Sequence, residues 1–188
     1  MRYLLLIFLF ISSAADAGSI IVPKHAPTIG NSRGTLQIVE FFDYRCGYCK
    51  KMVPTLEEVI KKHRDVKVVL IELPIFGGAS VEMAKSALAV KNLKSYKYFD
   101  YHKALMKHRG KFNNDSIKKI AAKLGINGDQ IIQEMNKDKY DKYLRDNLKL
   151  SETRRVRGTP HIVLDGNDIR GAIDFDDLNK YINRLKSK

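Results

Sequence analysis

The most constraining feature of this sequence is a pair of cysteines, Cys46 and Cys49, separated by two residues. An apolar, β-prone run over residues 36–42 precedes the pair, and a helical pattern over residues 51–62 follows at once. This order places two thiols at a strand-to-helix junction, with the first sulfur at the positive end of a helix. A thiolate there is stabilised by unpaired backbone N–H groups and by the helix dipole. The spacing therefore predicts a reactive thiol.

These are the only two cysteines in the 188-residue chain, so any disulfide within it joins Cys46 to Cys49. A bridge that closes so small a loop removes little entropy from the unfolded chain, which favours a chemical role over a structural one. The length and the 44% of hydrophobic residues are sufficient for one domain with a hydrophobic core.

Residues 1–17 carry one arginine near their start, a short apolar run and an ending of the form Ala15-X-Ala17. This pattern is typical of a cleaved secretory signal peptide, and the apolar run is shorter than the ~20 residues of a membrane-spanning helix. An uncleaved membrane anchor is the alternative. Export would bring the two thiols into an oxidising compartment, where disulfides persist.

Basic residues are in excess and are unevenly distributed. The formal net charge is +13, and residues 85–157 hold 19 lysines and arginines against 8 aspartates and glutamates. A solvated helical surface explains such an excess, while attraction to acidic partners or to an anionic membrane is the functional alternative. Nucleic-acid binding is not predicted, because no Gly-rich phosphate loop, zinc-finger spacing or RNA-binding aromatic motif accompanies the charge.

Hydrophobic periodicity predicts an α/β fold. Strands are expected over five segments: residues 19–22, 35–42, 66–73, 161–164 and 169–173. The long segment between the third and fourth strands has a helical period, with capping residues Ser80, Asp115 and Asp129 at the predicted helix starts. A last helix is expected to begin at Asp174.

These features resemble the thioredoxin superfamily and, within it, the exported DsbA-like thiol:disulfide oxidoreductases. The resemblance extends over essentially the whole chain after the signal segment. It rests on Cys46 and Cys49 at their junction, Pro54 five residues later, a helical insertion, and Thr159-Pro160 just before the final hairpin. It implies a thioredoxin fold formed by residues 18–79 and 156–188, with residues 80–155 inserted as a helical domain.

The resemblance also assigns roles. It implies that Cys46 is an exposed nucleophile, that Cys49 is a buried resolving thiol, and that a cis peptide joins Thr159 to Pro160 beside the sulfurs. Because proline has no N–H, the Thr159 backbone would be free to pair with an extended substrate. Glu40 corresponds to an acid that moves protons to or from the resolving cysteine. Its apolar neighbours would raise its pKa, as that role requires, although a surface position is the alternative.

Gly47 and Tyr48, between the cysteines, are expected at the substrate-facing side of the site. The best-known members of the family have Pro-His there, and a histidine would help to stabilise the thiolate. We therefore expect the pKa of Cys46 to be lowered, but not to the ~3.5 of the extreme case. The disulfide should be a weaker oxidant than the ~−120 mV archetype. Asp43, Tyr44 and Arg45 also flank the site, with no role assigned.

The sequence thus predicts a periplasmic protein disulfide oxidoreductase that donates its Cys46–Cys49 disulfide to reduced, unfolded proteins. The resemblance implies reoxidation by a membrane quinone-coupled oxidase, and we expect a monomer without cofactor or metal. A disulfide isomerase or reductase on the same fold is the first alternative, although residues 18–34 are too short for the N-terminal dimerisation module of known isomerases.

Two further alternatives are not enzymes. In a metal-binding protein, both thiolates would be ligands, but two cysteines without a nearby third ligand make a poor site, and the five histidines show no ligand spacing. A surface protein or antigen with incidental thiols is the other alternative, and it would keep its function after Cys46→Ser.

Overall fold

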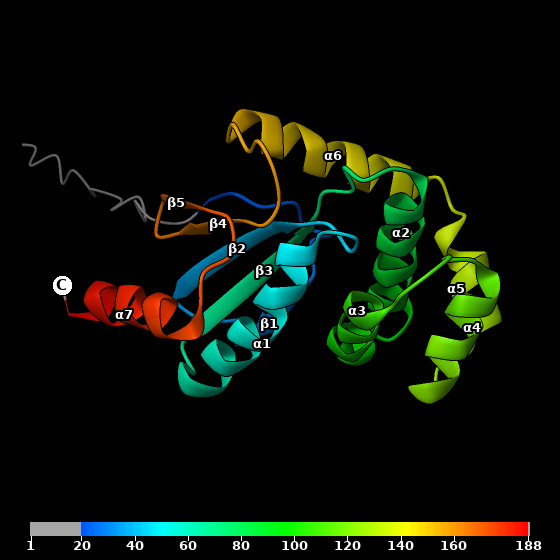
Figure 1. Ribbon diagram of the computed structural model, residues 1–188, viewed down its shortest axis with the longest axis horizontal. Coiled ribbons are helices and arrows are strands. Elements are labelled where there is room, and N and C mark those ends of the chain that lie inside the picture. Colours follow the sequence, from blue (N-terminus) through cyan, green and yellow to red (C-terminus); the bar gives the residue numbers. More distant parts are fainter. Residues whose placement is uncertain (1–19, 188) are drawn as a thin grey trace, which may run out of the picture.

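The structure, a computed structural model, describes residues 20–187 and contains a five-stranded sheet of order β1-β3-β2-β4-β5 (Figure 1). The strands are β1 Thr28–Gly30, β2 Leu36–Phe42, β3 Val66–Glu72, β4 His161–Leu164 and β5 Asn167–Arg170. β2 lies at the centre, parallel to β3 and antiparallel to β4. The predicted signal peptide, residues 1–17, lies outside the described residues.

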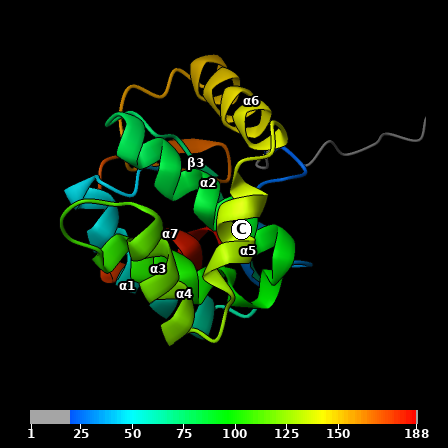
Figure 2. The same ribbon diagram turned by 90° about the vertical axis from the view of Figure 1, so that its right-hand side faces the viewer.

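Seven α-helices accompany the sheet in the described chain: α1 Gly47–Lys62, α2 Gly78–Leu93, α3 Tyr98–Lys107, α4 Asn114–Lys123, α5 Gly128–Met135, α6 Lys139–Thr153 and α7 Phe175–Lys186. A 3₁₀ turn over Ser95–Lys97 precedes α3. The helices α2 to α6 follow one another between β3 and β4, and α2 packs against α3, α5 and α6 (Figure 2). The α/β class is confirmed, whereas a separate insertion domain stays a prediction.

The central strand contributes side chains to two hydrophobic cores, because side chains alternate between the faces of a sheet. Ile38 and Phe42 belong to the larger core, which also contains buried residues of α1 and α7. Phe41 belongs to a smaller core on the opposite face, on which Leu150 of α6 packs. Glu40 stands between Ile38 and Phe42 in this alternation and therefore points toward the face that α1 covers.

The predicted first strand is wrong. Residues 20–22 form no strand, and the edge strand is β1, which pairs antiparallel with β3 and lies outside the five strands predicted from the sequence. β1 has only three residues, of which Ile29 alone is buried, so the sequence has no alternating pattern that would predict this strand. Gly30 ends the strand with a φ of 76°, a conformation that favours glycine.

Three predicted helix caps are also wrong. Asn113 and Asn127 cap α4 and α5 by accepting hydrogen bonds from the N–H groups three residues on, so these helices begin before Asp115 and Asp129. Asparagine and aspartate are equally good caps, and here the earlier residue takes the position. Ser80 lies inside α2, which follows Gly77. The cap at Asp174 is confirmed, since its carboxylate accepts from the Asp177 N–H.

The final hairpin is tighter than predicted. Leu164 pairs with Asn167, so Asp165 and Gly166 alone form the turn, both with positive φ. That combination is typical of a two-residue type I′ turn, which matches the twist of the flanking strands. β5 consequently starts at Asn167 instead of residue 169. Over residues 20–187, no helix has the length and apolar character to cross a membrane.

Candidate active site

The cysteines lie where the spacing predicts. Cys46 is the N-cap residue of α1 and Cys49 lies in its first turn, both as free thiols. Asp43 fixes the turn before them, because its main-chain carbonyl accepts a hydrogen bond from the Cys46 N–H at 3.1 Å. No side chain caps the start of α1. The first N–H groups of the helix are therefore available to a sulfur anion.

A loop remote in sequence completes the site. The thiol of Cys46 donates a hydrogen bond to the carbonyl oxygen of Thr159 at 3.2 Å. The predicted cis peptide between Thr159 and Pro160 is confirmed. The nucleophile was expected to be exposed, but Cys46 is only 5% exposed, and the Thr159 carbonyl contacts its sulfur. Cys49 is fully buried, as predicted.

The two sulfurs differ in acidity. Burial by itself raises the pKa of Cys46. The Thr159 hydroxyl, the Cys49 thiol, and the backbone N–H groups of Tyr48 and Cys49 outweigh it, so the pKa is lowered. The pKa of Cys49 is raised, first by burial and then by the charge of Glu40. Cys46 is therefore the cysteine that forms a thiolate, and Cys49 stays protonated. This asymmetry suits a pair in which Cys46 is the attacking or leaving sulfur and Cys49 is the second, buried thiol.

Glu40 is buried beneath this pair. It is 1% exposed, and its Oε1 atom has no hydrogen-bond partner among the described residues. Burial, followed by the charge of Cys46, raises the pKa of Glu40 to about 8. A surface position for Glu40 is therefore excluded, and the predicted desolvation is confirmed. A carboxyl with such a pKa can both give and take a proton near neutral pH.

The residues between the cysteines face outward. Tyr48 is 61% exposed, and the Lys51 amino group lies 5.1 Å from the centre of its ring. Tyr48 and Lys51 line a cavity of about 580 Å³ together with Thr159 and Gly171. At Gly47 an added Cβ would meet no atom within 4 Å, so the surface beside the sulfurs is open.

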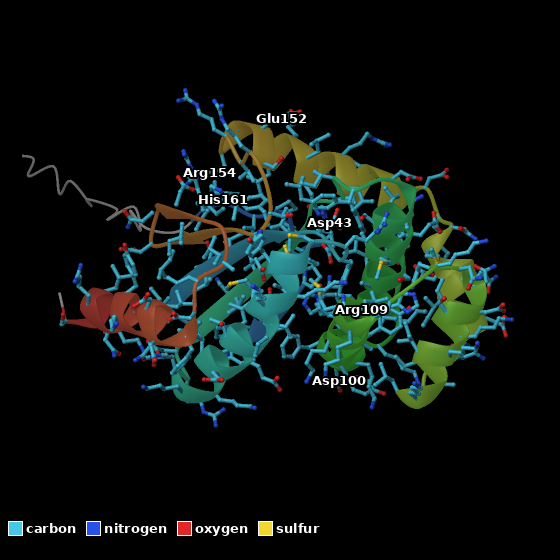
Figure 3. The ribbon with its side chains drawn as sticks, viewed as in Figure 1. Asp43, Asp100, Arg109, Glu152, Arg154 and His161 are labelled. Atoms are coloured by element: carbon cyan, nitrogen blue, oxygen red, sulfur yellow. The ribbon has the colours of Figure 1, made fainter. Side chains whose placement is uncertain are left out.

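Asp43 is the functional residue that the sequence does not assign. Its buried carboxylate accepts hydrogen bonds from the N–H groups of Ile75 and Phe76, at 2.7 and 3.0 Å, and from the Ser80 hydroxyl at 2.7 Å. Asp43, labelled in Figure 3, thus ties the loop after β3 and the start of α2 to the cysteine turn through these hydrogen bonds. Ile75 and Phe76 are about half exposed beside the site.

Besides Asp43, two buried side-chain hydrogen bonds connect α3 to the sheet and to the cysteine turn. The hydroxyl of Tyr98 donates to the Glu72 carboxyl at 3.0 Å, and the hydroxyl of Tyr44 lies 3.1 Å from His102 Nδ1. Burial raises the pKa of Glu72 to about 8 and lowers the pKa of His102 to about 3, so both side chains are neutral in the interior.

All five histidines form hydrogen bonds with residues other than the two cysteines. Each has a hydrogen-bond partner: Asn147 for His25, Asn179 for His63, Tyr44 for His102, the Lys111 carbonyl for His108 and Asp168 for His161. Within the part of the chain that the structure describes, no three histidine, cysteine or carboxylate side chains are grouped as metal ligands.

Known proteins are similar to this chain in sequence and in fold. A family model for the DSBA-like thioredoxin domain matches residues 37–183. The thiol-disulfide exchange protein alpha-DsbA2 from Wolbachia pipientis is 33% identical with a TM-score of 0.80, over 85% of this chain and 87% of its own. A periplasmic thioredoxin-like protein from Salmonella enterica serovar Typhimurium is 31% identical with a TM-score of 0.79, over 87% of this chain and 91% of its own.

Among curated proteins, Disulfide bond formation protein D of Bacillus subtilis is 21% identical over 178 residues, covering 88% of this chain and 79% of that protein. The matched region includes Glu40, both cysteines and the Thr159–Pro160 peptide. The thioredoxin fold implied by the resemblance is confirmed. This chain belongs to the DSBA-like thioredoxin domain family and is a DsbA-like disulfide oxidoreductase.

Proposed function

We propose that this protein is an oxidase that donates its Cys46–Cys49 disulfide to reduced proteins folding outside the cytoplasm. The observation that carries the proposal is the difference in acidity between the two cysteines, with the pKa of Cys46 lowered and that of Cys49 raised. An environment that stabilises a Cys46 thiolate stabilises the reduced protein. It therefore makes the disulfide easier to reduce and a stronger oxidant.

The proposed reaction has two exchange steps. A thiolate of the reduced substrate attacks Cys46 Sγ, the bond between Cys46 and Cys49 breaks, and a mixed disulfide with the substrate forms. A second substrate thiolate then attacks the substrate sulfur of that mixed disulfide, and Cys46 leaves as a thiolate. The substrate loses two electrons and gains a disulfide, while the Cys46–Cys49 disulfide is reduced.

Glu40 has the proposed role of proton donor to Cys49. When the first exchange expels Cys49, its sulfur becomes an anion in an apolar interior, which is unfavourable. With a pKa near 8, the Glu40 carboxyl holds a proton at neutral pH that it can pass to this sulfur, directly or through a water molecule. On reoxidation the proton travels back, because Cys49 must ionise before it can attack.

The Thr159 backbone is the proposed substrate contact. Its carbonyl oxygen accepts the hydrogen bond from the Cys46 thiol, and Pro160 offers no competing N–H. An extended substrate would lie along this edge, near Gly47 and Tyr48. A periplasmic location, a signal peptide over residues 1–17, a monomer, and reoxidation by a membrane quinone-coupled oxidase belong to the same proposal. The likeness to a periplasmic relative supports the location.

The test uses a reduced protein whose native state requires several disulfides. We expect the oxidised enzyme to form disulfides in this substrate, and we expect Cys46→Ser to abolish the reaction. A parallel sample in which the substrate starts with scrambled disulfides separates oxidase from isomerase. If the reduced enzyme restores native pairing there with high efficiency, while the oxidised enzyme oxidises the reduced substrate poorly, the isomerase alternative replaces the proposal.

A further inference from the structure

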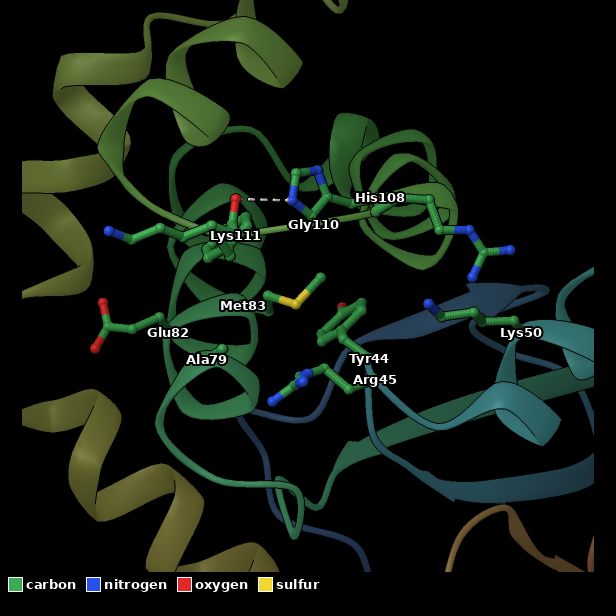
Figure 4. Close-up of a pocket in the computed structure, with 11 residues that line it drawn as sticks. Tyr44, Arg45, Lys50, Ala79, Glu82, Met83, His108, Gly110 and Lys111 are labelled. Carbon is green, nitrogen blue, oxygen red and sulfur yellow. Dashed lines mark hydrogen bonds between the residues drawn. The ribbon is translucent and has the colours of Figure 1, made fainter.

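A second cavity, of about 730 Å³, lies beside the cysteine turn and is strongly basic (Figure 4). Arg45 and Lys50, which flank the cysteines in sequence, contribute to it from one side. Arg109 and Lys111 contribute from the segment that joins α3 to α4. Glu82 of α2 is the one acidic residue among its lining residues.

The four cations have no acidic partners of their own. Within residues 20–187, none of them forms a salt bridge, although lysines elsewhere do, as Lys85 does with Asp141 at 2.6 Å. Partial burial, followed by the positive charges of Arg109 and Arg45, lowers the pKa of Lys50. The cations are thus close enough to repel one another, and an anion from outside would relieve that repulsion.

The layout of the cavity favours a chain of carboxylates over a single small anion. Lys50 lies on the opposite side of the cavity from Lys111 and Glu82, with Met83 and Tyr44 between them (Figure 4). Cations distributed around a wide opening do not converge on one point, as they would for one phosphate group. An extended peptide with acidic side chains at intervals can satisfy several of them, while its side-chain stems lie over Met83.

We propose that this cavity binds an acidic segment of the substrate protein, next to the cysteine that is being oxidised. The inference rests on the proposed function, because it supplies a reason for a polypeptide to lie beside Cys46. Arg45 directly precedes Cys46, and Lys50 directly follows Cys49. A peptide bound to these two cations would therefore pass close to the reacting sulfurs. The protein would select cysteines that have glutamates or aspartates nearby. Charge complementarity of this kind raises the rate of association.

The experiment compares two reduced peptides that each contain a pair of cysteines, flanked by glutamates in one and by glutamines in the other. The rate of peptide oxidation by the oxidised full-length protein is measured for both. Because flanking charges also change the acidity of the peptide thiols, the readout is the acidic-to-neutral rate ratio, compared between protein variants. The cavity variant is Arg109→Gln/Lys111→Gln. The matched control is Lys119→Gln/Lys123→Gln on α4, which removes the same charge from exposed positions outside the cavity.

We expect the rate ratio to fall at least about threefold in the cavity variant and to be unchanged in the control. Raising the ionic strength to about 0.5 M should remove the difference, because it screens exposed charges. An equal ratio in all three proteins would overturn the inference but leave the proposed function intact. Failure of the unaltered protein to oxidise either peptide would refute the proposed function itself. Binding to anionic phospholipid vesicles that requires Arg109 and Lys111, with no change in the ratio, would assign the cavity to a membrane surface instead.

Discussion

The thiol of Cys46 lies 3.2 Å from the carbonyl oxygen of Thr159, which is 113 residues away in sequence. This contact brings the start of α1 and the loop before β4 together at one sulfur. The hydrogen bond itself favours the thiol, because a thiolate has no proton to donate. The pKa of Cys46 is lowered nonetheless, because the Thr159 side chain, the Cys49 thiol and the N–H groups of Tyr48 and Cys49 outweigh the effect of burial.

The acidity of Cys46 gives the first prediction. In a Cys49→Ser variant, the rate of alkylation by iodoacetamide should rise with pH through a midpoint below the ~8.5 of free cysteine and above the ~3.5 of the extreme case. In the matched Cys46→Ser variant, Cys49 should react negligibly, since its pKa is raised and it is fully buried. Equal reactivity of the two variants would contradict the asymmetry.

The buried carboxyls predict how stability depends on pH. In the folded protein, Glu40 and Glu72 both have pKa values of about 8, whereas the ordinary value is 4.5. Between these values the folded state keeps a proton that the unfolded state has lost, so the free energy of unfolding falls as pH rises. We expect urea unfolding of the oxidised protein, in which Cys46 carries no charge and burial alone raises the pKa of Glu40, to show a loss of about 2 kcal/mol or more per carboxyl between about pH 5 and pH 8.

Glutamine substitutions separate the two carboxyls. Glu40→Gln and Glu72→Gln should each reduce the pH dependence of unfolding, because each removes one titrating group. Only Glu40→Gln should also slow thiol–disulfide exchange, since it removes the proposed proton donor to Cys49, whereas Glu72 is bonded to Tyr98. Equal exchange rates in both variants would argue against Glu40 as the proton donor.

The tie between Asp43 and the following loop gives a third prediction. In Asp43→Asn, the new amide N–H₂ group faces N–H donors, so at least one buried donor loses its partner. We expect the free energy of unfolding to fall by about 1–3 kcal/mol, measured with urea. Glu152→Gln, an exposed charge removal on α6, should change it by less than about 0.5 kcal/mol. An equally small effect at Asp43 would show that the loop does not depend on it.

The Tyr98 hydroxyl supports a fourth prediction. Tyr98→Phe leaves the buried Oε1 atom of Glu72 without its donor, so the free energy of unfolding should fall by about 1–3 kcal/mol. Tyr96→Phe is the matched control, since Tyr96 is 75% exposed and should tolerate the change within about 0.5 kcal/mol. Comparable losses in the two variants would mean that the buried hydrogen bond contributes nothing measurable.

Features with a strong local signal were predictable from the sequence. The apolar run of β2, the cysteine spacing and the helical period after it place Cys46 at the start of α1, as observed. The burial of Glu40 followed from its neighbours in a central strand. The roles of Asp43 and Tyr98 were not predictable, because their partners Ser80 and Glu72 lie 37 and 26 residues away in sequence.

Short elements were missed for a different reason. β1 forms because β3 offers an unpaired edge, and three residues are too few for a periodic pattern. The cavity lined by Arg45 and Arg109 could not be predicted from the sequence either. The sequence shows an excess of positive charge, but only the fold brings the segment after α3 beside the cysteine turn.

The most direct test of the central claim is the equilibrium constant between the Cys46–Cys49 pair and a glutathione redox buffer. A Cys46 thiolate stabilised at the start of α1 should place the potential between the ~−120 mV of the strongest oxidant of this kind and the ~−270 mV of thioredoxin. A potential at or below ~−270 mV would mean that the environment of Cys46 does not favour the reduced state, and it would contradict an oxidase.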